Sequence, residues 1–81
     1  MKTTPDQLAE LARSLESNEA FQAALDGVRD NALERMASLK PREDVDDIIE
    51  CQATVKVVDE IRADLERFVR SGRKRKPAGL A

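Results

Sequence analysis

The second half of the chain carries apolar residues at intervals of three and four over about five turns of helix. These intervals place side chains on one side of an α-helix, whereas a half-buried strand would alternate apolar and polar residues. Acidic residues crowd the start of this segment, where the helix dipole favours negative charge. The pattern predicts a helix over residues 43–71, about 40 Å long at 1.5 Å per residue. Its apolar stripe consists of Ile48, Cys51, Val55, Val58, Ile61, Leu65 and Phe68.

Two shorter helices are predicted ahead of this one. The first covers residues 5–16, because Thr4 can serve as its N-cap, Pro5 suits the first helical position, and Gln7 can complete a capping box. Ser17-Asn18 then interrupts the pattern and offers a new N-cap, although nothing there forbids a continuous helix. The apolar positions of this first helix are Leu8, Leu11, Ala12 and Leu15.

The second predicted helix covers residues 19–39. Pro41 ends it, because proline disfavours helical geometry at the preceding residue. Gly27 lies inside the helix and costs about 1 kcal/mol relative to alanine. It is either a close-packing point or a tolerated glycine, and the second interpretation is favoured. The stripe of this helix contains Phe21, Leu25, Val28, Ala32 and Met36.

The turn between the second and third helices is short, so the two should form an antiparallel hairpin. A chain of 81 residues buries only a modest core. Its single cysteine cannot form an internal disulfide, and without histidine it lacks the ligands for a structural zinc site. We therefore expect an all-α fold over residues 1–72. A short N-terminal helix accompanies an antiparallel, coiled-coil-like hairpin, which completes a helical bundle by self-association, most simply as a dimer.

The C-terminal residues form a separate segment by charge. Residues 1–72 carry ten basic and sixteen acidic side chains, whereas residues 73–81 carry a charge of +4. Gly72 is a natural residue to end the third helix, so residues 73–81 are predicted to be a flexible basic tail. A solubilising role is favoured for it, and weak, salt-sensitive contact with nucleic acid or with an acidic protein is the alternative. The candidate nucleic-acid contacts are Arg73, Lys74, Arg75 and Lys76.

The sequence offers little catalytic chemistry. Glu43, Asp47 and Glu50 share one helical face, but a di-metal helical site normally combines such acids with histidine, so we interpret them as solvated acids. Cys51 has no base nearby to form a thiolate, so we interpret it as a buried, inert thiol. We expect a protein that is not an enzyme and needs no cofactor or metal. No apolar run approaches the roughly 20 residues needed to span a bilayer, and the lone thiol suits a reducing compartment, so a cytoplasmic location is expected.

The residues from Phe21 to Val69 also resemble a known group of proteins. The order FQAALDGVRDNALERM followed by LKPREDVDDIIECQATVKVVDEIRADLERFV is similar to small uncharacterised helical proteins encoded in the virion-assembly regions of tailed bacteriophages and prophages. The resemblance covers about two thirds of the chain and includes no catalytic motif. It implies a helical accessory or structural protein, in the host cytoplasm or the virion, whose role depends on other phage proteins. It transfers no functional residue.

Together these patterns predict an interaction protein that acts through its apolar helix faces, on a second copy or on a larger protein. One alternative is a nucleic-acid-associated packaging or regulatory accessory that uses the basic tail. The other is a phage-borne acidic inhibitor that mimics nucleic acid through its acidic helix start. The predicted interface residues are Phe21, Leu25, Val28, Ile48, Val55, Val58, Ile61, Leu65 and Phe68.

Overall fold

The computed structural model describes the backbone of residues 3–78 and the side chains of residues 3–72. This part of the chain forms three helices and no strand, so the prediction of an all-α fold is confirmed. Helix α1 spans Pro5–Glu16, α2 spans Glu19–Ser38 and α3 spans Val45–Ala78.

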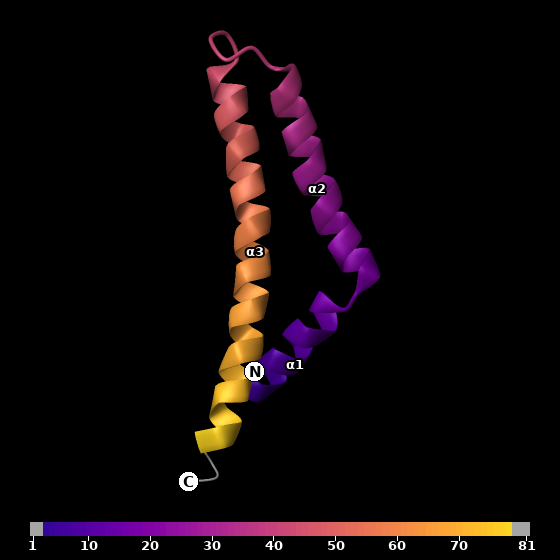
Figure 1. The fold of residues 1–81 in the computed structure, drawn as a ribbon, viewed down its shortest axis with the longest axis vertical. Helices are drawn as coiled ribbons and strands as arrows, with labels where there is room; N and C mark the ends of the chain where they lie inside the picture. The colour runs from indigo at the N-terminus through magenta and orange to yellow at the C-terminus, as the bar shows by residue number, and fades with distance from the viewer. Residues whose placement is uncertain (1–2, 79–81) are drawn as a thin grey trace.

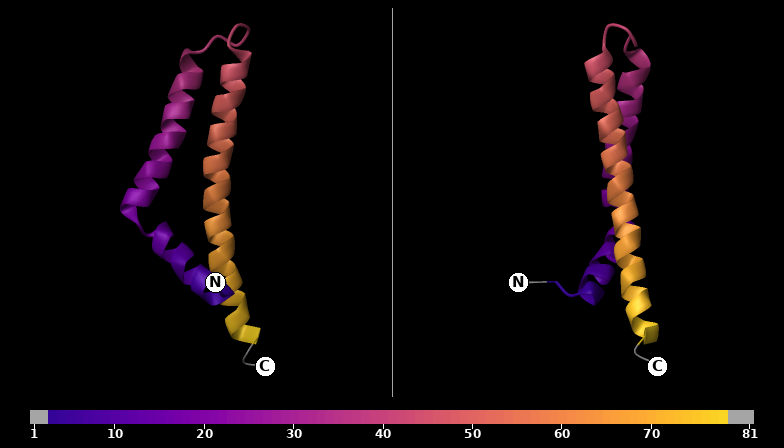
Figure 2. Two further views of the ribbon diagram at one scale, coloured as in Figure 1. Left: turned by 180° about the vertical axis from the view of Figure 1, so that it is seen from behind. Right: turned by 90° about the vertical axis from the view of Figure 1, so that its left-hand side faces the viewer.

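The three helices form two layers. Helix α3 is one layer, and α1 and α2 follow one another along it as the other layer, with a bend between them (Figure 1). Helix α2 lies beside the first part of α3, and α1 lies beside the later part of the same α3, while α1 and α2 touch one another little (Figure 2). The molecule measures 59 × 24 × 23 Å. Each of the shorter helices therefore has a single long neighbour.

Helices α1 and α2 each begin at a local cap, and the cap of α2 lies at the bend between them. The Thr4 hydroxyl accepts a hydrogen bond from the Gln7 N–H at 3.1 Å, and the Gln7 side chain accepts one from the Thr4 N–H, which confirms the predicted capping box. The Asn18 side chain accepts from the Phe21 N–H at 2.8 Å and starts α2 in a new direction. The Gln22 amide then donates to the Leu15 carbonyl across the bend.

The turn between α2 and α3 is closed by the residues around Pro41. Leu39 takes an extended conformation, with φ −86° and ψ 152°, and ends α2. The Lys40 N–H donates to the Asp44 carboxylate at 2.8 Å, and the Lys40 carbonyl accepts from the N–H groups of Glu43 and Asp44. Proline cannot donate a backbone hydrogen bond, so its place in this turn leaves no helical bond unmade.

Helix α3 does not end at residue 71 as predicted, but continues to Ala78. Gly72 has no positive φ, so it is not a left-handed cap. It is buried against α1, where a Cβ would overlap the Cβ of Ala9. The close-packing glycine is thus Gly72, while a Cβ at Gly27 would meet nothing within 4 Å. Of the predicted flexible tail over 73–81, residues 79–81 and the side chains of 73–78 lie outside the described residues.

The core is small, and one cluster of it lies where α1 meets α3. Buried residues also lie between α2 and α3, namely Leu25, Ala32, Cys51 and Val58. Ala12 of α1 packs with Leu65 and Val69 of α3, and Phe21 and Phe68 pack against this cluster. The residues of α1 that face α3 most closely are small, because Ala9 and Ala12 are both only 2% exposed. The larger Leu11 is 58% exposed instead. Small side chains let the two helices approach closely, while Leu11 and Leu15 of the α1 stripe remain at the surface and Leu8 is half-buried.

Candidate functional site

An apolar groove runs between α2 and α3 on one side of the molecule. Its volume is about 410 Å³. Val28 of α2 and Val57 and Ile61 of α3 remain 49%, 52% and 37% exposed along it, although all three are large apolar residues. This apolar groove is lined by Leu25, Val28, Glu50, Ala53, Thr54, Val57, Val58 and Ile61.

The opposite side of the α2–α3 pair is closed by ion pairs. The Arg62 guanidinium donates a hydrogen bond to the Asp26 carboxylate in an ion pair, and the Arg29 Nε lies 3.0 Å from the Asp59 carboxylate. Residues two apart on a helix point about 200° apart around it, so Asp59 and Val57 face opposite sides of the pair. We call the side with these four charged residues the ionic flank. The two sides therefore differ: one is closed by charged side chains, and the other leaves apolar surface uncovered.

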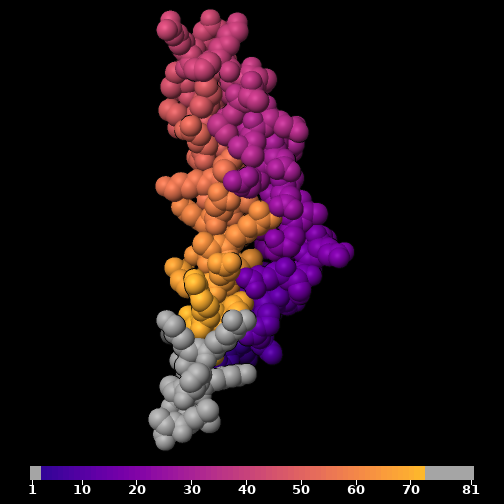
Figure 3. All heavy atoms as spheres, viewed as in Figure 1, coloured from indigo at the N-terminus to yellow at the C-terminus, as the bar shows by residue number. Residues whose placement is uncertain are grey.

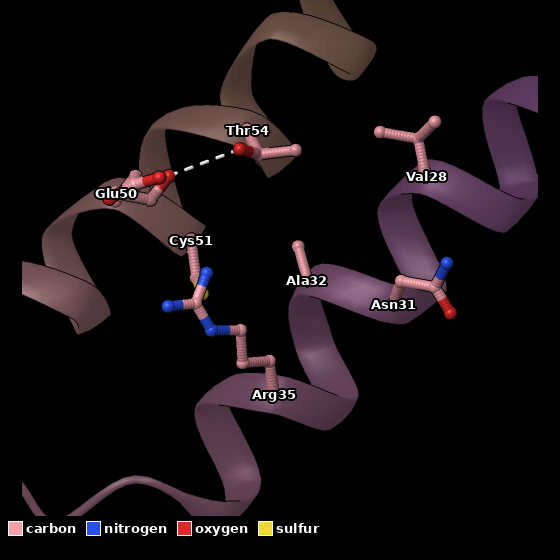
Figure 4. Close-up of a pocket in the computed structure, with 7 residues that line it drawn as sticks. All are labelled: Val28, Asn31, Ala32, Arg35, Glu50, Cys51 and Thr54. Atoms are coloured by element: carbon pink, nitrogen blue, oxygen red, sulfur yellow. Dashed lines mark hydrogen bonds between the residues drawn. The ribbon is translucent and has the colours of Figure 1, made fainter.

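A second hollow of about 260 Å³ continues the apolar groove toward the turn, and the two share Val28, Glu50 and Thr54. Figure 4 shows Arg35 of α2 reaching toward α3 beside Cys51. Cys51 is 3% exposed and forms the floor. The Thr54 hydroxyl donates to the Glu50 carbonyl of its own helix at 3.1 Å. The hollow thus has an apolar floor, with the basic Arg35 and the acidic Glu50 near its edge. Arg35 also forms an exposed ion pair with Asp47 of α3, at 3.4 Å.

The predicted interface residues divide into three groups. Leu25, Val28, Val58 and Ile61 meet in the apolar groove. Phe21, Leu65 and Phe68 belong instead to the small core with α1. Ile48 and Val55 are half-buried on α3, outside both groups. The side chains of the predicted nucleic-acid contacts, Arg73, Lys74, Arg75 and Lys76, lie outside the described residues.

Val57 is the large apolar residue of the groove that the sequence interpretation missed. It lies next to the stripe residue Val58 and therefore points away from the centre of the stripe. The available signal was the spacing of Thr54, Val57 and Ile61, which are three and four residues apart and share a face. They form a second, shorter row beside the main stripe, and that row lines the groove.

The groove is suited to burying apolar side chains, since Glu50 is the one charged residue that lines it. Among the described residues, no three or more His, Cys, Asp or Glu side chains are grouped to hold a metal ion. None of the helices in the described part of the chain has the length and apolar character needed to cross a membrane.

Comparison with protein-family models, with curated proteins and with solved structures finds no match to this chain. The resemblance to phage virion-assembly proteins therefore stays a prediction.

Proposed function

We propose that this chain is a non-enzymatic helical interaction protein that works by burying its apolar helix faces against another protein chain. It self-associates, most simply as a dimer in which two antiparallel hairpins of α2 and α3 complete a four-helix bundle. The observation that carries the proposal is the apolar groove, because Val28, Val57 and Ile61 lie beside one another at the surface and no element of the described part of the chain covers them.

The size of the exposed surface supports a partner. The chain has 6447 Å² of accessible surface, whereas a compact monomer of its mass exposes about 4,900 Å². The radius of gyration is 17.4 Å, against about 12 Å for a compact domain of this length. A standard interface covers about 800 Å² on each partner, which is less than this excess.

The shape of the chain explains this excess. Helices α1 and α2 cover one side of α3 in sequence rather than surrounding it, and α3 lies open beside them in the space-filling view (Figure 3). Each apolar stripe is therefore covered on one side only. Removing such surface from water contributes about 25 cal/mol per Å² of apolar area, which is the driving force of the proposed association. A role in virion assembly would use the same surface and stays a prediction.

The test is the mass of the protein in solution. Light scattering coupled to gel filtration, with sedimentation equilibrium over a range of concentrations, should give about twice the chain mass of 9.0 kDa. A monomer throughout the micromolar range would contradict the proposal of self-association. If that monomer were also compact, with a small hydrodynamic radius, the open arrangement of α1, α2 and α3 would fail as well.

A further inference from the structure

The charges along the apolar groove and the second hollow that continues it are arranged unevenly. Arg35 of α2 and Glu50 of α3 line the same hollow, so they lie at the same height along the helix axes, which we call one level of the hairpin. Val28 of α2 and Val57 of α3 likewise line the groove together at a second level. Asp64 lies further along α3, past the end of the groove. Each helix thus presents a charged position at one level and an apolar position at the next.

We infer that the occupant of the groove is a second copy of this chain, docked about a two-fold axis parallel to the helices. In this arrangement α3 of each copy lies antiparallel to α2 of the other. A two-fold axis of this direction keeps every residue at its own level. Glu50 therefore comes opposite the partner's Arg35, and Val57 comes opposite the partner's Val28. This inference rests on the self-association proposed above and specifies its geometry.

The charges disfavour the other simple arrangement. A two-fold axis perpendicular to the helices reverses the levels, so that α3 packs on the partner's α3. With the axis near Val57, at the middle of the groove, Glu50 and the partner's Asp64 would come together, since each lies seven residues from Val57. Like charges placed together across an interface oppose association. The parallel axis avoids this pair and also makes all neighbouring helices antiparallel, which suits their dipoles.

The ionic flank is a poorer surface for a second copy. A partner there would have to cover the four charged residues of two ion pairs, Arg62, Asp26, Arg29 and Asp59, and removing such charges from water is costly. In the described part of the chain, the corresponding ion pair on the groove side is the single Arg35–Asp47 contact near the turn, beside uncovered apolar surface. Residues 1–72 carry a net negative charge, so two copies repel one another in general. Contact through the groove places the basic Arg35 of each copy against an acid of the other and reduces this repulsion.

Two charge-reversal variants test the geometry. Glu50→Arg places two arginines together across the interface, and Arg35→Glu places two glutamates together, so each variant alone should weaken self-association about tenfold. An equimolar mixture should recover nearly the wild-type dissociation constant, because in the mixed dimer each Arg lies opposite a Glu. Sedimentation equilibrium measures the homodimers, and energy transfer between differently labelled chains measures the mixed dimer. A mixture that associates no better than the single variants would overturn the inference, and the effect of Arg35→Glu would then come from the ion pair of Arg35 with Asp47 within one chain.

A second pair of variants tests the groove without changing its charge pair. Val28→Asp, at a 49% exposed position in the groove, should abolish the dimer, whereas Leu33→Asp, at a 39% exposed position about 140° further round α2, should leave it intact. Far-UV circular dichroism checks that both variants remain helical. A wild-type protein that stays monomeric would refute the proposed function itself. A wild-type dimer unaffected by Val28→Asp, or disrupted equally by Leu33→Asp, would refute only the groove-to-groove geometry.

Discussion

Gly72 of α3 lies against Ala9 of α1 so closely that no Cβ fits at position 72. The two residues are far apart in the sequence, and their contact fixes where α1 docks on α3. It also explains why α1 turns small residues toward α3, since Ala9 and Ala12 are almost completely buried.

We expect Gly72→Ala to destabilise the protein. The added methyl group must displace Ala9, and overpacking of this kind costs about 1–3 kcal/mol. The better helix propensity of alanine offsets about 1 kcal/mol of that cost. The midpoint of thermal unfolding, followed by circular dichroism, should therefore fall by several degrees.

Gly27→Ala is the matched control, because a Cβ at position 27 meets nothing within 4 Å. Here the helix propensity acts alone, and the free energy of unfolding should rise by about 0.5–1 kcal/mol. Equal shifts in the same direction for both variants would show that α1 does not pack on Gly72.

Val58→Asp should unfold the hairpin and disrupt assembly together. Val58 is 3% exposed, and an unpaired carboxylate there loses its hydration without gaining a partner. We expect a loss of at least about 3 kcal/mol, seen as a lower denaturant midpoint. Val55→Asp should act in the same direction but less strongly, because Val55 is half-buried.

The control for Val58→Asp is Ile49→Asp on the same helix. Ile49 is 57% exposed and does not line the groove, so its replacement should change the free energy of unfolding by no more than about 0.5 kcal/mol. A large loss at Ile49 would place a buried contact on a face of α3 that is open in the described structure.

Cys51→Ser should keep the fold and the self-association. Cys51 is buried between α2 and α3 at 3% exposure, and serine is close to it in size, so the main cost is burial of a hydroxyl, roughly 1–3 kcal/mol. Sedimentation and thermal unfolding measure the two properties. A folded, correctly associated serine variant that lost its biological activity would instead give the thiol a chemical role.

Truncation after Gly72 tests the basic segment. The close contact with Ala9 is retained, so self-association should persist, while the far-UV signal should lose the helical contribution of residues 73–78. If Arg73 to Lys76 contact phosphate, the full-length chain should bind duplex DNA weakly at low salt. The logarithm of its affinity should fall with the logarithm of salt concentration with a slope of roughly three to four. Truncation should then abolish the binding, whereas tight binding that survives it would move the nucleic-acid site onto the helices.

Local features of the sequence were sufficient to predict the local features of the fold. Thr4, Gln7 and Asn18 cap helices through bonds to residues three positions away, and Pro41 acts on its immediate neighbour. Such interactions span a few residues, so a short pattern contains everything that determines them. The capping box and the all-α class were predictable for this reason.

Gly72 was misinterpreted because its role is not local. A glycine that follows Arg67 and Arg70 is typical of a helix end, and nothing nearby in the sequence indicates otherwise. The contact that overrides this pattern comes from Ala9 on another helix. The apolar stripe of α3 is divided between the core with α1 and the groove with α2 for the same reason, because contacts with other helices decide it. Whether Leu65 or Ile61 is covered depends on the direction of the bend between α1 and α2, and spacing within α3 carries no information about that bend.

The docking of α1 on the later part of α3 also determines when this helix can fold. The ribosome makes α1 first and makes residues 65–72, on which it packs, dozens of residues later. Chain synthesis adds roughly 5–20 residues per second, so Ala9 and Ala12 stay uncovered for several seconds before residues 65–72 exist. During this time Leu11 and Leu15 are also exposed to water and to chaperones. The α2–α3 contact closes a shorter loop at lower entropic cost. The α2–α3 pair can thus begin to form from its turn while the chain is still growing, and α1 packs on it last.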